Sequence, residues 1–331
     1  MMRAHICVTG GAGYVGSQTV WALHDRQMPV VVYDDLSTGH REFLPPSVPV
    51  IIGDVRNGKA LGRCFEDFGV KAVIHCAALA LVAESMAHPG RYWSVNVGGT
   101  AELAGAAAAN GVKAIVFSSS AAVYGEPAQI PIPEQAPRVP INPYGRSKLA
   151  AEQVLADACA AGGAKWLAFR YFNAGGADSK GRTGEAHEPE SHIIPNVLKV
   201  AQAMASGQNV EPVQCFGGDY PTTDGTCVRD YIHTMDLAEA HLRGVEYLMA
   251  GGESRAFNLG TGQGVSLREI IRAARQVTGQ QIPYKIAARR PGDPATLVAD
   301  ADQAWQSLGW RARYSAMPNI LGTAWAWSRR A

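Results

Sequence analysis

The glycine-rich segment at residues 10–16 constrains the possible folds more than any other feature of the chain. It follows a short apolar run, His5–Thr9, and precedes an apolar-periodic stretch, so it lies between a predicted strand and a predicted helix. Gly10, Gly13 and Gly16 have the spacing G-x-x-G-x-x-G. Glycine at these positions permits a tight turn and close backbone approach, so that a pyrophosphate can rest on the helix N-terminus. The segment therefore predicts a dinucleotide-binding βαβ unit.

An acidic residue follows this unit at the place where a dinucleotide site needs one. Asp34 ends the apolar run 29–33, eighteen residues after Gly16. A carboxylate there accepts hydrogen bonds from the adenosine ribose and repels a 2′-phosphate, which favours NAD over NADP. Glycine loops are common by themselves, but here strand, loop, helix, strand and acid occur in the required order. The chain therefore predicts bound NAD.

Apolar runs alternate with helical stretches through the first half of the chain. The runs are typical of buried strands and cover residues 49–52, 72–75, 114–117 and 166–170. This alternation predicts an α/β fold with a parallel, doubly wound sheet of the Rossmann type and right-handed crossovers.

A change in composition marks the expected domain boundary. From about Gly175 to Pro189 the alternation gives way to a segment rich in Gly, Asp, Glu and Pro. We expect a dinucleotide-binding domain over residues 1–176 and a smaller α/β substrate domain over residues 177–331. Two later apolar runs predict that the chain returns to the first domain around residues 229–262.

Tyr144 and Lys148 are the strongest candidates for catalysis. They lie four residues apart in a segment that begins with Asn142, a predicted N-cap, and Pro143, which is favoured at the first helical position. Positions four apart share one face of a helix, so the Lys148 ammonium can lie near the Tyr144 phenol and favour its ionised form. Such a tyrosine is a general base for oxidising an alcohol. The spacing alone is also compatible with a half-buried tyrosine beside an exposed lysine.

Three serines supply further hydroxyl groups to this candidate site. Ser118, Ser119 and Ser120 follow the run 114–117, so they are predicted at the carboxyl end of a strand, where open α/β sheets bind their ligands. Lowering a phenol pKa from about 10 to about 7 requires roughly 4 kcal/mol of differential stabilisation. A bound cationic cofactor, Lys148 and the Ser120 hydroxyl are expected to share it.

Composition excludes several classes of partner. The formal net charge of the 331 residues is +1 and no basic run occurs, so neither nucleic acid nor an anionic membrane is expected. The six cysteines are scattered without metal-ligand spacing, and no metal site is predicted. No apolar stretch approaches about 18 uninterrupted residues, and the first strand begins without room for a signal peptide. We expect a cytoplasmic protein with buried thiols.

Four longer motifs resemble those of a known family; they cover residues 9–17, 118–125, 170–173 and, longest, 216–233. Over almost its whole length the chain is similar to the extended short-chain dehydrogenase/reductases, and within them to the UDP-glucose (UDP-galactose) 4-epimerases. This resemblance implies an NAD-dependent isomerase that oxidises C4 of the hexose transiently, lets the 4-keto sugar turn over and returns hydride to its opposite face. It also implies Tyr144 as the base, Lys148 as its partner and Ser120 as the hydroxyl at the C4 oxygen.

The same resemblance implies the cofactor contacts. Tyr14 and Val15 would contact the pyrophosphate, Asp34 the adenosine ribose, and Asp54 with Val55 the adenine. The complete implied set is Gly10, Gly13, Tyr14, Val15, Gly16, Asp34, Asp35, Leu36, Ser37, Asp54, Val55, Cys76, Ala77, Ala78, Ala80, Ser118, Tyr144, Lys148, Tyr171 and Phe172.

The resemblance also implies how a UDP-sugar would be held. Arg229 and Arg290 would bind the two phosphates, because the guanidinium fork matches phosphate oxygens. Asn173 and His192 would hold diphosphate or ribose, residues 214–216 the uracil and Asp293 the uridine ribose. The complete implied set is Ser120, Tyr144, Asn173, His192, Gln214, Cys215, Phe216, Arg229, Arg290, Asp293 and Leu297.

Two other functions remain open from the sequence. A nucleotide-sugar dehydratase or decarboxylase shares the cofactor site and base but needs an acid near the reacting sugar. Enzymes of that kind have Asp or Glu where this chain has Ala121 and Ala122, and alanine donates no proton. A non-catalytic NAD-binding scaffold is the second alternative, and it would need neither Tyr144 nor Lys148.

The chain departs from the family pattern at three positions. Ala80 stands where many of these epimerases have a lysine near the cofactor phosphates, so weaker cofactor retention is expected. Val95 replaces one of two asparagines, which removes a polar contact if that position faces the cofactor. Leu297 is smaller than the tyrosine of some relatives and is expected to admit UDP-N-acetylglucosamine and UDP-N-acetylgalactosamine. The family is usually homodimeric through helices near 93–109 and 144–161, and a homodimer is expected here.

Overall fold

A seven-stranded sheet forms the larger part of the molecule, which the computed structural model describes over residues 5–190, 192–289 and 293–330. Its strand order is β10-β6-β5-β4-β1-β2-β3, and all neighbouring strands run parallel. The strands are β1 (His5–Thr9), β2 (Val30–Asp34), β3 (Val50–Ile52), β4 (Val70–His75), β5 (Ala114–Ser118), β6 (Lys165–Tyr171) and β10 (Arg255–Leu259). The predicted doubly wound α/β fold is confirmed.

Helices cover both faces of this sheet. Ile6 and Val8 of β1 face a core that includes α1 (Tyr14–Asp25), α8 (Thr234–Met249) and α10 (Asp302–Leu308). Cys7, between them, faces the opposite core with α2 (Gly58–Asp67), α5 (Gly99–Ala109) and α6 (Pro143–Gly162). Because both faces are covered, the strands are continuous apolar runs rather than alternating ones. Short elements complete this part: η1 (Arg41–Phe43), α3 (Val82–Ala87), α4 (Pro89–Tyr92), the π-helical η2 (Trp93–Gly98) and η3 (Ala121–Val123).

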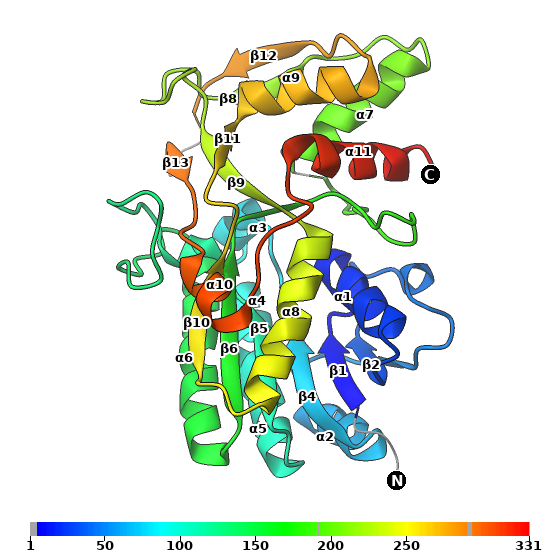
Figure 1. Ribbon diagram of the computed structural model, residues 1–331, viewed down its shortest axis with the longest axis vertical. Helices are drawn as coiled ribbons and strands as arrows, with labels where there is room; N and C mark the ends of the chain where they lie inside the picture. Colours follow the sequence, from blue (N-terminus) through cyan, green and yellow to red (C-terminus); the bar gives the residue numbers. More distant parts are fainter. Residues whose placement is uncertain (1–4, 191, 290–292, 331) are drawn as a thin grey trace.

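A smaller unit stands at the edge of the sheet toward which the parallel strands run (Figure 1). Its strands form two small sheets, one of β7 (Asn173–Gly175), β9 (Val228–His233), β11 (Gly264–Ser266) and β13 (Thr296–Leu297), the other of β8 (Val213–Phe216) and β12 (Tyr284–Ala287). A separate apolar core joins them to α7 (Ile193–Ala205), α9 (Leu267–Thr278) and α11 (Met317–Ser328). The carboxyl ends of the large sheet therefore face a second body.

The chain passes between the two units several times. After β9 it returns to the large sheet as α8 and β10, and later as α10, whose Leu308 packs into the same core as Leu237 of α8. A site at the junction can consequently draw residues from distant parts of the sequence. None of the described helices is long and apolar enough to cross a membrane.

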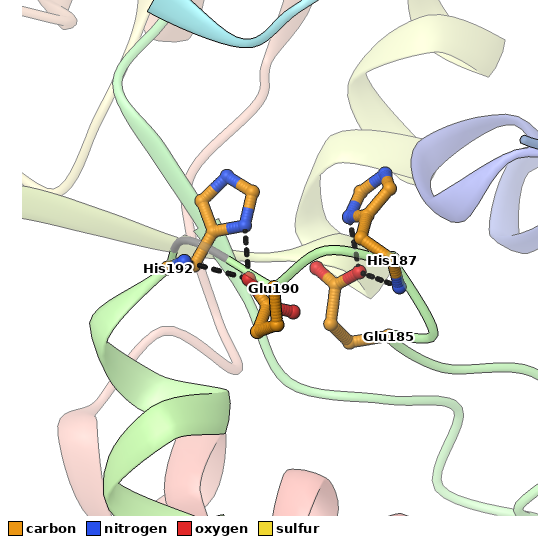
Figure 2. A group of neighbouring side chains, drawn as sticks. All are labelled: Glu185, His187, Glu190 and His192. Atoms are coloured by element: carbon orange, nitrogen blue, oxygen red, sulfur yellow. Dashed lines mark hydrogen bonds and ion pairs between the residues drawn. The ribbon is translucent and has the colours of Figure 1, made fainter. Parts of the chain in front are cut away.

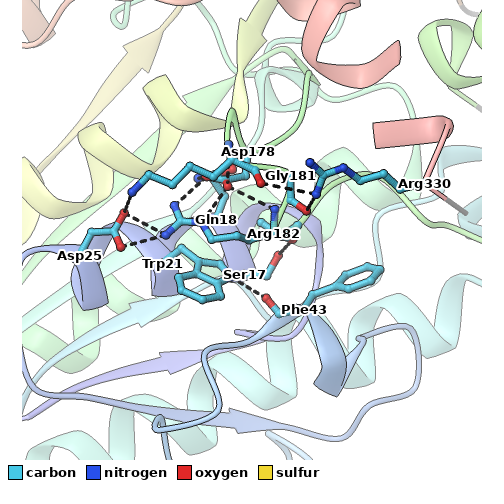
Figure 3. Close-up of polar contacts among 11 residues, drawn as sticks. Ser17, Gln18, Trp21, Asp25, Phe43, Asp178, Gly181, Arg182 and Arg330 are labelled. Carbon is cyan, nitrogen blue, oxygen red and sulfur yellow. Dashed lines mark hydrogen bonds and ion pairs between the residues drawn. The ribbon is translucent and has the colours of Figure 1, made fainter. Parts of the chain in front are cut away.

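The loop after β7 ties the smaller unit to α1 (Figure 3). Ser17 and Thr183 share a hydrogen bond of 2.5 Å between their hydroxyls. Arg182 lies over the Trp21 ring at 4.2 Å and pairs with both Asp25 and Asp178. Because α1 begins at the glycine-rich loop, these contacts set the position of the smaller unit relative to that loop.

Helix α6 begins as the sequence predicts. Asn142 is its N-cap, with the side-chain oxygen accepting from the Gly145 backbone N–H at 2.8 Å, and Pro143 is the first helical residue. The helix ends at Gly163, whose φ of 73° is left-handed and favours glycine. The cap and the helix end fix which residues of α6 face the end of β5.

A buried ion pair lies beneath the serines that follow β5. The Arg170 guanidinium donates to both carboxylate oxygens of Glu152, at 2.9 and 2.6 Å. The two side chains are only 3% and 2% exposed. Ser119 donates to the same carboxylate at 2.5 Å, and Arg170 also donates to the Tyr124 hydroxyl at 2.9 Å. The pair thus joins α6, β6 and the Ser119 loop.

We predict that Glu152→Ala destabilises the protein by about 3–5 kcal/mol, because Arg170 would remain buried without a counter-charge. The free energy of unfolding in urea measures this effect. The matched control is Arg91→Ala, which removes an exposed ion pair with Glu84 and is expected to cost at most about 1 kcal/mol. Equal losses for the two variants would contradict the prediction.

Candidate active site

The predicted cofactor loop lies at the carboxyl end of β1 and leads directly into α1. Gly10 has a φ of 68°, and a Cβ there would collide with the Ala77 backbone. A Cβ on Gly16 would collide with the Gly10 carbonyl oxygen. Both positions therefore require glycine, and the first turn of α1 lies close against the ends of β1 and β4. The loop has the close backbone packing that a pyrophosphate-binding turn needs.

Asp34 braces this loop. Its two carboxylate oxygens accept hydrogen bonds from the backbone N–H groups of Ala12 and Leu36, each at 2.8 Å. Burial raises the pKa of the Asp34 carboxyl, and the two backbone hydrogen bonds lower it. A carboxylate has about four acceptor sites, so capacity for ribose hydroxyls remains. The structure adds a second role to the predicted one, since the same side chain holds the glycine-rich loop in place.

Other predicted cofactor residues lie around the same edge of the sheet. The Tyr14 hydroxyl donates to the Gly176 carbonyl at 2.5 Å, which links the start of α1 to the chain after β7. Asp35 accepts from the Ser37 backbone and hydroxyl, at 3.0 and 2.7 Å. Asp54 is paired with Arg56 at the surface. The remaining residues of the predicted set lie near the carboxyl ends of β1 to β4: Val15 at the start of α1, Leu36 after β2, Val55 after β3 and residues 76–80 after β4.

Lys148 is buried under the end of β5. Its ammonium donates to the Ser118 carbonyl at 2.8 Å and lies 6.0 Å from the centre of the Tyr144 ring. Burial lowers the pKa of Lys148 to about 8, while the charge of Glu152 raises it. The lysine therefore remains largely protonated at neutral pH and places a positive charge beside Tyr144.

Tyr144 and Ser120 meet at the same place. Burial raises the pKa of the Tyr144 phenol, and the neighbouring Ser120 hydroxyl lowers it. Ser120 itself accepts from the Ala122 backbone N–H at 3.1 Å. A cation bound in the site, as the oxidised nicotinamide ring would be, would stabilise the phenolate further.

A hydrogen-bond chain behind Ser118 has no counterpart among the sequence predictions. His241 of α8 is buried, and burial lowers its pKa to about 4, so the ring is neutral at pH 7. Its Nδ1 lies 2.7 Å from the Leu237 carbonyl, which can only accept, so the proton is on Nδ1 and Nε2 accepts from the Ser118 hydroxyl at 2.8 Å. The oxygen of Ser118 is then directed toward the Cys76 thiol at 3.2 Å. His241 thereby orients a predicted cofactor contact.

Asn96 fixes the segment after β4. Its side-chain oxygen accepts from the Leu79 backbone N–H at 2.8 Å, and its amide donates to the Leu79 carbonyl and to the Ser147 hydroxyl, at 3.0 and 2.9 Å. Asn96 therefore connects residues 77–80, which include Ala80, to α6. His241 belongs to no motif with a local signature, because it acts on a residue far away in the sequence. Asn96 is the retained member of the asparagine pair in which Val95 replaces the other.

The predicted sugar-side residues come from several elements. Arg229 of β9 pairs with Asp293, and Leu297 of β13 lies opposite Arg229 in the strand register. Leu297 and Phe172 both pack against a small apolar cluster formed by Ala121, Val123, Tyr124 and Ile132. Although Leu297 and Ser120 are far apart in the sequence, this cluster places Leu297 next to the Ser120 end of the site.

The predicted nucleotide contacts divide into three groups. Asn173 begins β7, and His192 is the N-cap residue of α7 with its ring 2.8 Å from Glu190. On β8, Gln214 is exposed and Phe216 half-buried, whereas the Cys215 side chain is fully buried, so only the backbone of Cys215 can face a ligand. Arg290 lies outside the described residues.

Comparisons with known proteins agree on one family. The model of the NAD dependent epimerase/dehydratase family matches residues 6–260. A UDP-glucose 4-epimerase of Lacticaseibacillus casei is 48% identical over 97% of this chain and 96% of its own length. The crystal structure of UDP-glucose 4-epimerase from Brucella ovis in complex with NAD has a TM-score of 0.93, 43% identity and 98% coverage of both chains. That of the Bifidobacterium longum enzyme in complex with NAD+ and UDP has a TM-score of 0.91 and 36% identity, covering 99% of this chain and 98% of that one.

We predict that His241→Leu weakens NAD binding through Ser118 alone. Calorimetric titration of wild type, His241→Leu, Ser118→Ala and the double variant should show a coupling of about 1 kcal/mol, because removing the histidine has no further effect once the serine hydroxyl is gone. Additive losses would show that His241 acts by packing instead.

Proposed function

The chain belongs to the NAD dependent epimerase/dehydratase family, and on this basis we propose that it is a UDP-glucose 4-epimerase that interconverts UDP-glucose and UDP-galactose. The observation that supports this most directly is the grouping of Tyr144, Lys148 and Ser120 at the carboxyl edge of the sheet. This is the arrangement needed to remove a proton from a secondary alcohol as hydride leaves the same carbon.

In the proposed mechanism Tyr144 removes the proton from the 4′-hydroxyl of the hexose. NAD, when bound, supplies reversible uptake of hydride from C4′ and is regenerated in each turnover. Ser120 donates a hydrogen bond to the C4 oxygen, and the Lys148 ammonium stabilises the Tyr144 phenolate. The glycine-rich loop and Asp34 hold the dinucleotide. The 4-keto sugar then turns over, and hydride returns to the opposite face of C4′. Tyr144 returns the proton to the C4 oxygen, which completes the epimer.

The nucleotide side of the site has to provide most of the affinity. The nucleotide contacts proposed here are Arg229 of β9, Asp293 in the loop before β13 and Asn173 of β7, which can hold UDP at a distance from C4. A sugar that was gripped tightly could not turn over. Binding energy placed on remote groups avoids this conflict.

A dehydratase is less well supported. Ala121 and Ala122 occupy the first turn after Ser120, where an elimination reaction needs a carboxylic acid. The similar proteins described above are named UDP-glucose 4-epimerases, which also favours the epimerase. A cofactor-binding scaffold is disfavoured because it would have no need of the buried Lys148 beside Tyr144.

We further propose a cytoplasmic homodimer. The cysteines of the described chain are free, which suits a reducing compartment. Val82, Met86 and Trp93 are 44%, 63% and 44% exposed, beside the helices α5 and α6 expected to form the interface. Light scattering should give the mass of two chains, and Trp93→Glu should shift it toward one. A monomeric wild-type protein would contradict the dimer, and sedimentation with a membrane fraction would contradict the location.

We predict that Tyr144→Phe lowers the rate of UDP-galactose conversion by about 10²–10⁴-fold while NAD still binds. The measurement is the appearance of UDP-glucose by NMR with added NAD. Tyr247→Phe is the matched control, because its hydroxyl is remote from the site and accepts only from the Glu253 backbone. Unchanged turnover by Tyr144→Phe would remove the proposed base, and a stable 4-keto or dehydrated product from wild type would favour a dehydratase.

We predict that the enzyme also epimerises UDP-N-acetylglucosamine and UDP-N-acetylgalactosamine, because Leu297 leaves more room than a tyrosine would. Leu297→Tyr should abolish this activity and retain most of the activity on UDP-galactose. If wild type converts only the two hexoses, Leu297 does not set the size of the pocket.

A further inference from the structure

Two Glu-x-His pairs converge just before α7 (Figure 2). Glu185 and His187 form the first pair and Glu190 and His192 the second, five residues further along the chain. One ligand atom from each of the four side chains lies within 4.8 Å of the other three. The two imidazole rings are side by side, with centres 5.6 Å apart. Oxygen and nitrogen ligands from two pairs thus meet around one point.

The two pairs have the same local geometry. Glu190 accepts from the His192 backbone N–H at 2.6 Å and contacts the His192 Nδ1 at 2.8 Å. Glu185 accepts from the His187 backbone N–H at 3.2 Å and contacts the His187 Nδ1. Each carboxylate therefore fixes the orientation of its own imidazole. The carboxylate oxygen and the imidazole nitrogen of each pair are therefore already next to each other without an ion.

The charges in this cluster are incompletely balanced. The side chains of Glu185 and Glu190 are 11% and 17% exposed, so both carboxylates are largely removed from water. Within the described part of the chain each is paired with its histidine, and neither forms an ion pair with a lysine or arginine. Two half-buried carboxylates of this kind favour a divalent cation over none.

We propose that Glu185, His187, Glu190 and His192 form a binding site for one divalent transition-metal ion, of which Zn²⁺ is the best fit. Two imidazoles and two carboxylates are ligands that Zn²⁺ accepts in a tetrahedral site. Bonds of roughly 2.0–2.2 Å place tetrahedral ligands roughly 3.3–3.6 Å apart, so the widest separation among the four groups has to shorten by about 1 Å, and the closer contact within each Glu–His pair has to lengthen. They all belong to the connection between β7 and α7, where such a movement disturbs no regular element.

The site is anchored against the predicted cofactor loop. The His187 ring meets the Tyr14 ring edge-on at 6.2 Å, and the Glu185 carbonyl accepts from the Trp327 indole N–H at 2.9 Å. An ion at this point would connect the loop after β7, the start of α7 and the face of Tyr14. It would thereby stiffen the junction between the two units. The expectation that the chain has no metal site rested on the spacing of its cysteines. This spacing argues against a thiolate site only, and the four ligands proposed here are imidazoles and carboxylates.

The test uses the full chain, cleared of metal with a chelator. Equilibrium dialysis against Zn²⁺ should give one ion per chain in wild type, with affinity at least about tenfold lower in His187→Ala and in Glu190→Gln. Glu188→Gln and His88→Ala are matched controls that change an exposed carboxylate in the same segment and a histidine elsewhere, and both should bind as wild type does. Circular dichroism checks that each variant is folded. If His187→Ala is not folded, His187→Gln is measured in its place.

Two further readouts distinguish this site from adventitious binding. Co²⁺ should give visible absorption bands without the near-ultraviolet band of a cobalt–thiolate bond, because no cysteine belongs to the cluster. Zn²⁺ should raise the melting temperature of wild type and of Glu188→Gln but not of His187→Ala. Binding that survives both ligand substitutions, a thiolate band, or no saturable binding by wild type would each overturn the proposal.

Discussion

The bond from the Lys148 ammonium to the Ser118 carbonyl joins the two elements on which the site depends. It fixes α6 against the end of β5, so Tyr144, one turn earlier on the helix, is held beside Ser120. The ammonium is fully enclosed, and its pKa falls to about 8 because burial disfavours the charge. A cation kept in such a place is available to stabilise a phenolate without competition from water.

The polar groups around this bond support one another. Glu152, one turn after Lys148, neutralises Arg170 and accepts from Ser119, while His241 orients Ser118 from the opposite side of the sheet. The serines at the end of β5 are therefore held from three directions. Each of these partners is buried, and losing one would leave another unpaired, which is why a short loop can keep a fixed geometry.

The local features of the site could be predicted from the sequence because their causes are local. The glycine spacing, the end of β2 at Asp34 and the Asn142 cap of α6 each depend on residues within a few positions of one another. The fold class followed from the continuous apolar runs, since strands covered on both faces have no polar alternation. The family resemblance extended these predictions to residues without any local signal, such as Arg229 and Leu297.

The sequence by itself determined which residues form the strands, the glycine-rich turn and the helix with the candidate base. Only the tertiary structure decided that His241 lies behind Ser118, that Asn96 holds Leu79, and that His187 packs against Tyr14. The physical reason is how far apart in the sequence the interacting residues are. Turns and caps are set by the backbone's own sterics and neighbouring hydrogen bonds, whereas these contacts arise when elements from distant parts of the chain pack around a common sheet edge.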